Sequence, residues 1–547
     1  MRSSSKVSHS DVRASALWGA GSRKGELRSS ALWGKGGRRV AGALLAVVAL
    51  AIPLGAAAGN RDGKGSREGA TYVSPGLLKA AHDKPGEKVR IIVQSSGGVS
   101  DADEALKGAG SLKKQLELIG AVAVEVPAAK VDQLAKVEGL TITPDAPVKV
   151  SGSTAAGRYS AQIWPYESGN AALWPNSNAS ANLTIAVVDS GVESGRADFG
   201  GRLLPQVNLS SLTPDATGDD RGHGTFVAGI AAGDALGYTG ANPGAKILPI
   251  RVMNELGMAR TSDVIRAAEW IYENKGTYNI KVANFSLHSA MPSRFIHDPL
   301  DKAVEKLWFS GVVVVVAAGN YGTPGGPSGV KYAPGNDPFV ITVGAVDIGD
   351  SIKPKDDYAP SWSAYGYTYD GFAKPEIGAP GRYMVGPVPV GSTLPKERPL
   401  NVEAPGYMQL SGTSFAAPAV AGAVAHILAK HPEYTPDQVK GALMVTAKAL
   451  PTAIPLSAGV GELNAAKAAN MGKAPPNPNA ALNRFVVSAS GGSGKVFDAA
   501  SWASAVAANA SWADASWADA SWADASWSSA SWSDASWADA SWAAGAL

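Results

Sequence analysis

Three short segments of this chain carry an acid, a base and a hydroxyl. Asp189 lies in VVDSG after an apolar run, His223 lies in DRGHGT, and Ser414 lies in SGTSFAAP. A carboxylate can fix the tautomer of an imidazole, and the imidazole can then take the proton of a hydroxyl, which turns that hydroxyl into a nucleophile. The chain order Asp, His, Ser is one of the orders in which this catalytic triad is known.

Each of these residues also has a simpler structural explanation. An Asp after a strand commonly forms a turn, and a Ser before an apolar helix commonly caps it, so either residue alone indicates little. Of the seven histidines, His223 alone combines glycine on both sides with a position at the start of a helical stretch. Because the three residues occur together and in order, we interpret them as one catalytic unit. The chain has no cysteine, which excludes a thiol nucleophile, a cysteine-ligated zinc and disulfides.

Taken together, the three segments resemble those of the subtilisin-like serine proteases, and the resemblance covers residues 155–472. It implies that Ser414 is the nucleophile, His223 the general base and Asp189 its orienting acid. It further implies that the Asn320 side chain donates to the oxyanion. An extended substrate strand is expected to lie against Ser286, Leu287, Gly319 and the segment after Asn320. Catalysis by such a site requires no cofactor.

The sequence departs from the usual family pattern at three places. His288 and Ser289 follow Leu287 where relatives usually carry glycines that line the primary specificity pocket, and Phe226 replaces a common histidine. The loop 233–240 is short where many relatives wrap a calcium ion. The preferred side chain before the scissile bond and a structural calcium ion therefore stay open.

Strands and helices alternate through residues 155–472. Uninterrupted apolar runs such as 312–316 are typical of strands buried on both faces of a parallel sheet. We expect a three-layer α/β fold with a mostly parallel sheet. The expected strands are 183–188, 246–252, 281–286, 312–317 and 339–343, and the expected helices are 223–232, 262–274 and 299–309.

Residues 70–150 read as a separate small α+β domain, for which the resemblance implies a ferredoxin-like propeptide that acts as chaperone and inhibitor. Strands are expected at 89–93, 119–126 and 140–142, with helices at 101–112 and 128–137. The extended, β-branched segment 146–151 is followed by small polar residues. We expect the enzyme to cut its own chain between about residues 150 and 165.

The two ends differ from the middle. Residues 1–58 combine a basic leader with the apolar run 40–58, which indicates a signal peptide; a membrane anchor and a misassigned start are the alternatives. Residues 473–498 are expected to form a linker. Residues 499–547 repeat tryptophan every five residues, which places the rings on no single helical or strand face, and are expected to form a low-complexity tail.

These features predict a secreted or cell-envelope associated serine endopeptidase made as a self-processing zymogen. Its partners would be protein or peptide substrates, its own propeptide and, through the tail, the cell envelope. The formal charge of only +2 over 547 residues gives no indication of a nucleic acid partner. Two alternatives are an inactive protease fold that serves as a surface or adhesion module, and a peptide ligase or esterase with the same triad.

Overall fold

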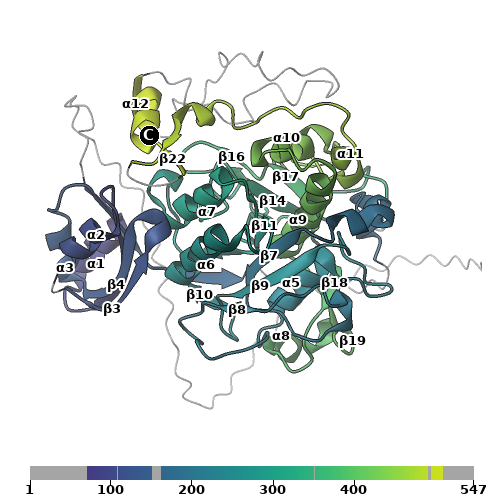
Figure 1. Cartoon of the computed structure of the whole chain (residues 1–547), viewed down its shortest axis with the longest axis horizontal. Coiled ribbons are helices and arrows are strands. Elements are labelled where there is room, and N and C mark those ends of the chain that lie inside the picture. The colour runs from purple at the N-terminus through teal and green to yellow at the C-terminus, as the bar shows by residue number, and fades with distance from the viewer. Residues whose placement is uncertain are drawn as a thin grey trace, which may run out of the picture. The chain divides into compact units, whose positions relative to one another are not determined.

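A computed structural model describes residues 71–107, 109–150, 162–349, 351–451, 453–490 and 494–508 (Figure 1). The expected signal peptide, the cleavage segment 151–161 and the tryptophan repeats from Trp512 onward lie outside these described residues. No helix in the described ranges is long and apolar enough to cross a membrane.

The N-terminal domain has the expected ferredoxin-like α+β fold. Its five-stranded sheet has the order β1-β5-β2-β4-β3, in which β2, β3 and β4 form antiparallel pairs with their neighbours. Its elements are β1 (Tyr72–Val73), α1 (Pro75–Asp83), β2 (Lys88–Ser95), α2 (Val99–Ala105), β3 (Ser111–Leu116), β4 (Ala121–Pro127), α3 (Ala129–Leu134) and β5 (Leu140–Pro144).

This sheet is apolar on both faces. Ile91 and Val93 of β2 pack in a core with residues of α1, α2 and α3, whereas Ile92, between them, belongs to the core of the larger domain. Since successive strand residues point to opposite faces, the run Ile91-Ile92-Val93 serves two interfaces at once. The second face therefore buries apolar area only when the larger domain is present.

The helix expected at 101–112 is partly wrong. The helix α2 ends at Ala105, and Ser111–Leu116 forms the edge strand β3, paired with β4. The segment SLKKQL contains no β-branched residue, so its local preference does not favour a strand. Pairing with β4 decides its conformation.

The larger domain is built on a seven-stranded sheet of order β17-β14-β13-β11-β7-β9-β8, in which every neighbouring pair is parallel. This confirms the expected three-layer α/β class. The strands are β7 (Thr184–Asp189), β8 (Val207–Asn208), β9 (Lys246–Arg251), β11 (Ile280–Phe285), β13 (Val313–Ala317), β14 (Ile341–Val346) and β17 (Ile377–Pro380). All five strands expected from the sequence occur within a few residues of their predicted positions, whereas β8 and β17 were not predicted.

Helices cover both faces of this sheet (Figure 1). The pair α5 and α9 packs together on one face, and α6 and α7 pack together on the other. Gly and Ala in α9 allow close packing: a Cβ at Gly422 would lie 2.4 Å from the Ala241 methyl. The helices are α5 (His223–Ala232), α6 (Thr261–Asn274), α7 (Pro299–Phe309), α9 (Thr413–Lys430), α10 (Pro436–Thr446) and α11 (Ala465–Ala469).

The strand order fixes where a ligand site can form. The chain runs from β7 to β9 on one side, and then returns to β11 on the other side of β7. Such a reversal leaves a crevice at the carboxyl ends of the strands, where open α/β sheets place their ligands. Asp189 is the last residue of β7 and therefore lies at this crevice.

The C-terminal segment differs from the expected linker and tail. Residues 473–498 contain a 3₁₀ turn (Leu482–Phe485) and a hairpin of β21 (Val486–Ser488) and β22 (Lys495–Phe497), and the helix α12 (Ala499–Ala508) follows. Trp502 of α12 is 5% exposed and packs against Phe295, Phe372 and Phe497. The five-residue period places the tryptophan rings on no single face of a helix. Burial of the Trp502 ring alone nevertheless packs α12 against the larger domain.

Candidate active site

Asp189 and His223 form a buried hydrogen-bonded pair. The Nδ1 atom of His223 lies 2.8 and 2.9 Å from the two carboxylate oxygens of Asp189, and the two residues are 0% (Asp189) and 1% (His223) exposed. An Nδ1–H that donates to this carboxylate leaves Nε2 as the basic nitrogen. Nε2 is buried and has no hydrogen-bond partner among the described residues.

Glycines bring the two elements that carry this pair together. A Cβ at Gly224, directly after His223, would lie 2.1 Å from the Gly191 carbonyl oxygen, and a Cβ at Gly191 would lie 2.1 Å from that of Gly218. Gly191 also has a φ of 101°, which disfavours any other residue. The first turn of α5 can therefore approach the end of β7 only with glycine at these positions.

The loop before His223 is held by Asp219, a residue that sequence reasoning did not single out. The Asp219 carboxylate accepts hydrogen bonds from Ser190 Oγ (2.8 Å), Gly222 N (2.7 Å), and Thr225 N and Oγ1 (2.8 and 2.6 Å). Burial raises the pKa of Asp219, and these donors oppose that shift. Because Ser190 follows Asp189 and Thr225 lies in α5, Asp219 ties the acid and the base to each other.

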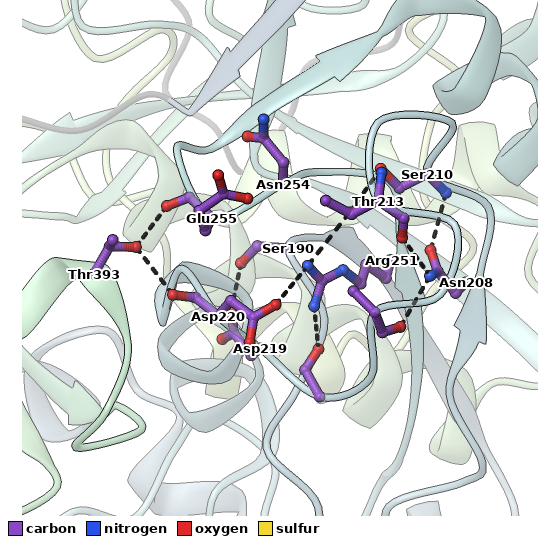
Figure 2. Close-up of polar contacts among 12 residues, drawn as sticks. Ser190, Asn208, Ser210, Thr213, Asp219, Asp220, Arg251, Asn254, Glu255 and Thr393 are labelled. Carbon is purple, nitrogen blue, oxygen red and sulfur yellow. Dashed lines mark hydrogen bonds and ion pairs between the residues drawn. The ribbon is translucent and has the colours of Figure 1, made fainter.

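Arg251 supports the same loop from the side opposite Thr393 (Figure 2). Its side chain is fully buried at the end of β9 and donates to the Gly218 carbonyl (3.0 Å) and to Asp220 Oδ2 (2.9 Å). On the outer side, Thr393 Oγ1 donates to the Asp220 carbonyl at 2.9 Å. The loop 218–222 is therefore fixed on both sides.

Ser414 lies in the first turn of α9, beside the end of β11. Its Oγ donates to the Ser286 carbonyl at 3.2 Å, and Ser286 Oγ donates to the Ser414 carbonyl at 2.7 Å. The next residue, Phe415, has its ring 5.4 Å from the His223 ring. The helix N-terminus gives this serine the positive end of the helix dipole.

The Asn320 amide is oriented by Thr413. Asn320 Oδ1 accepts from Thr413 N at 2.9 Å and from Thr413 Oγ1 at 3.0 Å. The same Oγ1 accepts from Gly319 N at 3.1 Å. Asn320 Nδ2 is buried and has no partner among the described residues, so the amide presents its donor side next to Ser414. Thr413 was missed as an orienting residue, although it lies in the same motif as Ser414.

The segment that leaves the N-terminal domain runs through the cleft as the central strand of a three-stranded sheet. The strand β6 (Pro147–Val150) lies between β10 (Met258–Arg260) and β12 (Leu287–Ser289) and is antiparallel to both. Leu287 lies opposite Val150. The second wall is therefore β10, whereas we expected the segment after Asn320 in this role.

Three buried carboxylates form a cluster with the spacing of a metal site, and it is the one such cluster among the described residues. Glu167, Asp357 and Glu462 have oxygens within 4.8 Å of one another. Lys448 forms ion pairs with Glu167 and with Glu462 (3.4 Å). Burial and the neighbouring Glu462 raise the pKa of Asp357 to about 8. A protonated Asp357 beside Glu462 lowers the repulsion among these carboxylates.

The parallel sheet, the buried aspartate–histidine pair at its edge and the serine in the first turn of α9 are features of a three-layer α/β serine hydrolase. Residues 180–461, more than half of the chain, match the Subtilase family of peptidases. The chain therefore belongs to the subtilase family.

Similar proteins agree with this assignment. Serine protease AprX of Bacillus subtilis (strain 168) is 35% identical over 47% of this chain and 59% of its own length. Subtilisin J of Geobacillus stearothermophilus is 31% identical over 68% of this chain and 88% of its own. Several curated relatives are thus matched over only about three fifths of their length.

A solved structure shares the fold. The crystal structure of fervidolysin from Fervidobacterium pennivorans, a keratinolytic enzyme related to subtilisin, superposes with a TM-score of 0.55 and 23% identity, over 72% of this chain and 62% of that one.

Proposed function

We propose that this subtilase is an exported serine endopeptidase made as a self-processing zymogen. The observation that carries the proposal is the strand β6, which pairs by its backbone with both walls of the cleft and runs toward Ser414. A cleft that accepts one extended chain as an added strand can accept another, with affinity from main-chain hydrogen bonds.

The side chains beside that strand supply peptide hydrolysis. His223 Nε2 takes the proton of Ser414 Oγ as Oγ attacks the substrate carbonyl, and Asp189 stabilises the imidazolium. The imidazolium then protonates the leaving amine, and water repeats the sequence on the acyl-enzyme. Asn320 Nδ2 donates to the oxyanion, which matches a donor with no other described partner.

The N-terminal domain acts on this site as inhibitor and folding aid. Its residues bind the helix α6 from three positions: Asp145 accepts from Ser262 N (2.9 Å), Lys114 donates to Asp263 (2.6 Å), and Leu118 N donates to Glu269 (3.0 Å). These contacts hold β6 in the cleft, where it blocks other chains. Export is proposed from the basic leader and apolar run of residues 1–58. Attachment to the cell envelope through the tail is a further part of the proposal.

Labelling and casein digestion test the proposal. A fluorophosphonate should label the wild-type enzyme, and the enzyme should cut casein, whereas Ser414→Ala should do neither. The mass of Ser414→Ala protein should include residues 71–150 on the same chain, while the wild type should lose them. Unchanged digestion by Ser414→Ala would refute the mechanism, and normal cleavage of that variant in pure form would refute self-processing. Hydrolysis of small esters without digestion of casein would indicate an esterase.

Asn320→Ala gives a quantitative check of the oxyanion donor. We expect kcat to fall by about a hundredfold or more, the size of effect known for the equivalent donor of a subtilisin. KM should change little, because the bond forms in the transition state. The exposed Asn182→Ala is the matched control and should keep normal kcat. An Asn320→Ala enzyme with normal kcat would exclude the assigned role.

A further inference from the structure

We propose that three aromatic rings next to β12 restrict the residue before the scissile bond to glycine, alanine or serine. The inference rests on the proposed function, because it concerns the selectivity of the same cleft. The rings belong to His288, Tyr321 and Tyr332.

The strand register identifies which substrate residue lies at the reacting serine. Val150 lies opposite Leu287, Lys149 opposite His288 and Val148 opposite Ser289. Moving one residue further along the same antiparallel register leads to Ser286, whose carbonyl accepts the hydrogen bond of Ser414 Oγ at 3.2 Å. A substrate residue opposite Ser286 therefore carries the carbonyl that Ser414 can reach.

The alternation of side chains then shows where that residue points. Directly opposed residues in an antiparallel pair share a face, and residues two apart on one strand share it as well. Ser286 and His288 are two apart, so the substrate side chain opposite Ser286 lies on the face of the His288 ring. That side chain must fit beside whatever surrounds this ring.

Two further rings surround His288. The His288 ring centre is 5.6 Å from that of Tyr321 and 5.4 Å from that of Tyr332, and the two tyrosine rings are 4.7 Å apart. The Tyr321 ring also covers Gly319, where an added Cβ would lie 2.2 Å from it. The rings therefore reach from β12 to the segment that carries the Asn320 amide.

Backbone contacts hold the rings in place. The Tyr321 hydroxyl accepts from Lys331 N at 3.3 Å, and Ser289 N donates to the Ala333 carbonyl at 2.7 Å, which joins the neighbours of His288 and Tyr332. A large side chain would have to displace rings that contact one another, which costs contact energy for each pair. A methyl or hydroxymethyl group needs little of this space.

Peptide substrates that differ only in the residue before the scissile bond test the proposal. For the mature enzyme, kcat/KM with alanine or serine there should exceed kcat/KM with phenylalanine by about a hundredfold. His288→Gly and Tyr321→Ala should each reduce this ratio at least tenfold, mainly by improving hydrolysis of the phenylalanine peptide. The control His431→Gly removes a ring stacked on Tyr434, 4.4 Å away and outside the cleft, and should leave the ratio unchanged.

Equal or better cleavage after phenylalanine by the wild type would overturn the proposal, and so would an unchanged ratio in a folded His288→Gly enzyme. If His288→Gly does not fold, the ends of casein fragments made by the wild type decide: small residues support the proposal and large ones refute it. Whatever the side-chain preference, labelling by fluorophosphonate and digestion of casein would support the proposed function. Absence of both activities would refute the proposed function instead.

Discussion

Asp145 of the N-terminal domain caps the first turn of α6 in the larger domain. Its two carboxylate oxygens accept from Ser262 N at 2.9 Å and from Ser262 Oγ at 3.0 Å, and Arg90 Nη2 lies 3.0 Å from the same carboxylate. Under the proposed maturation, the helix gains its cap from a segment that is later removed. An inhibitor contact and a folding contact are then the same bond.

Removing this cap should weaken the zymogen. In the uncut Ser414→Ala background, Asp145→Ala should lower the free energy of unfolding by about 1–3 kcal/mol, because buried donors lose a charged acceptor. Denaturant titration measures the change. Asp132→Ala, at an exposed position of the same domain, is the control and should change little. Equal stability of the two variants would show that the bond contributes nothing.

Asp219 should behave as a positioning residue. Asp219→Asn replaces a carboxylate oxygen with an amide N–H₂, which faces the N–H and O–H donors that Asp219 now accepts from. We therefore expect kcat to fall about tenfold or more, with a smaller change in KM. The free energy of unfolding should fall by about 1–3 kcal/mol. Steady-state kinetics and thermal melts measure these effects. Asp215→Asn alters an exposed carboxylate four residues before Asp219 and should retain normal kinetics. If Asp219→Asn is folded and fully active, the tie between Asp189 and His223 is not needed for catalysis.

Trp502 should matter for stability and the later repeats should not. Trp502→Ala removes a buried ring from the contacts with Phe295, Phe372 and Phe497, which should cost about 3 kcal/mol or more. Trp512→Ala, in the repeats, is the matched control. Removal of residues 509–547 should leave the melting temperature unchanged, while removal of 499–547 should lower it. The same melting temperature for both truncations would exclude an anchoring role for α12.

The buried carboxyl cluster should make stability depend on pH. Because the pKa of Asp357 is raised to about 8 in the folded state, the folded chain holds a proton that the unfolded chain releases near pH 4. Its contribution to stability therefore falls as pH rises from about 4 to 8. Asp357→Asn should gain melting temperature relative to the wild type across this range, whereas exposed Asp356→Asn should not. A constant difference between Asp357→Asn and the wild type would contradict the raised pKa.

The sequence by itself determined the parts of this protein that depend on short segments. Apolar runs located the central strands, and Asp189 and Asn320 follow two of these runs, because parallel strands bring their carboxyl ends to one edge. His223 was identified by its flanking glycines at the start of a helical stretch. The three-layer fold followed from the same alternation. The family resemblance then suggested a role for each residue.

Tertiary structure alone decided the contacts between distant segments. The Ser190–Asp219 hydrogen bond, the pairing of β6 with both walls and the ring contacts of His288 each join residues far apart in the chain, and no local pattern specifies such partners. The same holds for β3, whose sequence does not favour a strand until β4 supplies pairing, and for the burial of α12, which depends on the phenylalanine rings around Trp502. Local preference is worth a few tenths of a kcal/mol per residue, so burial against a partner overrides it.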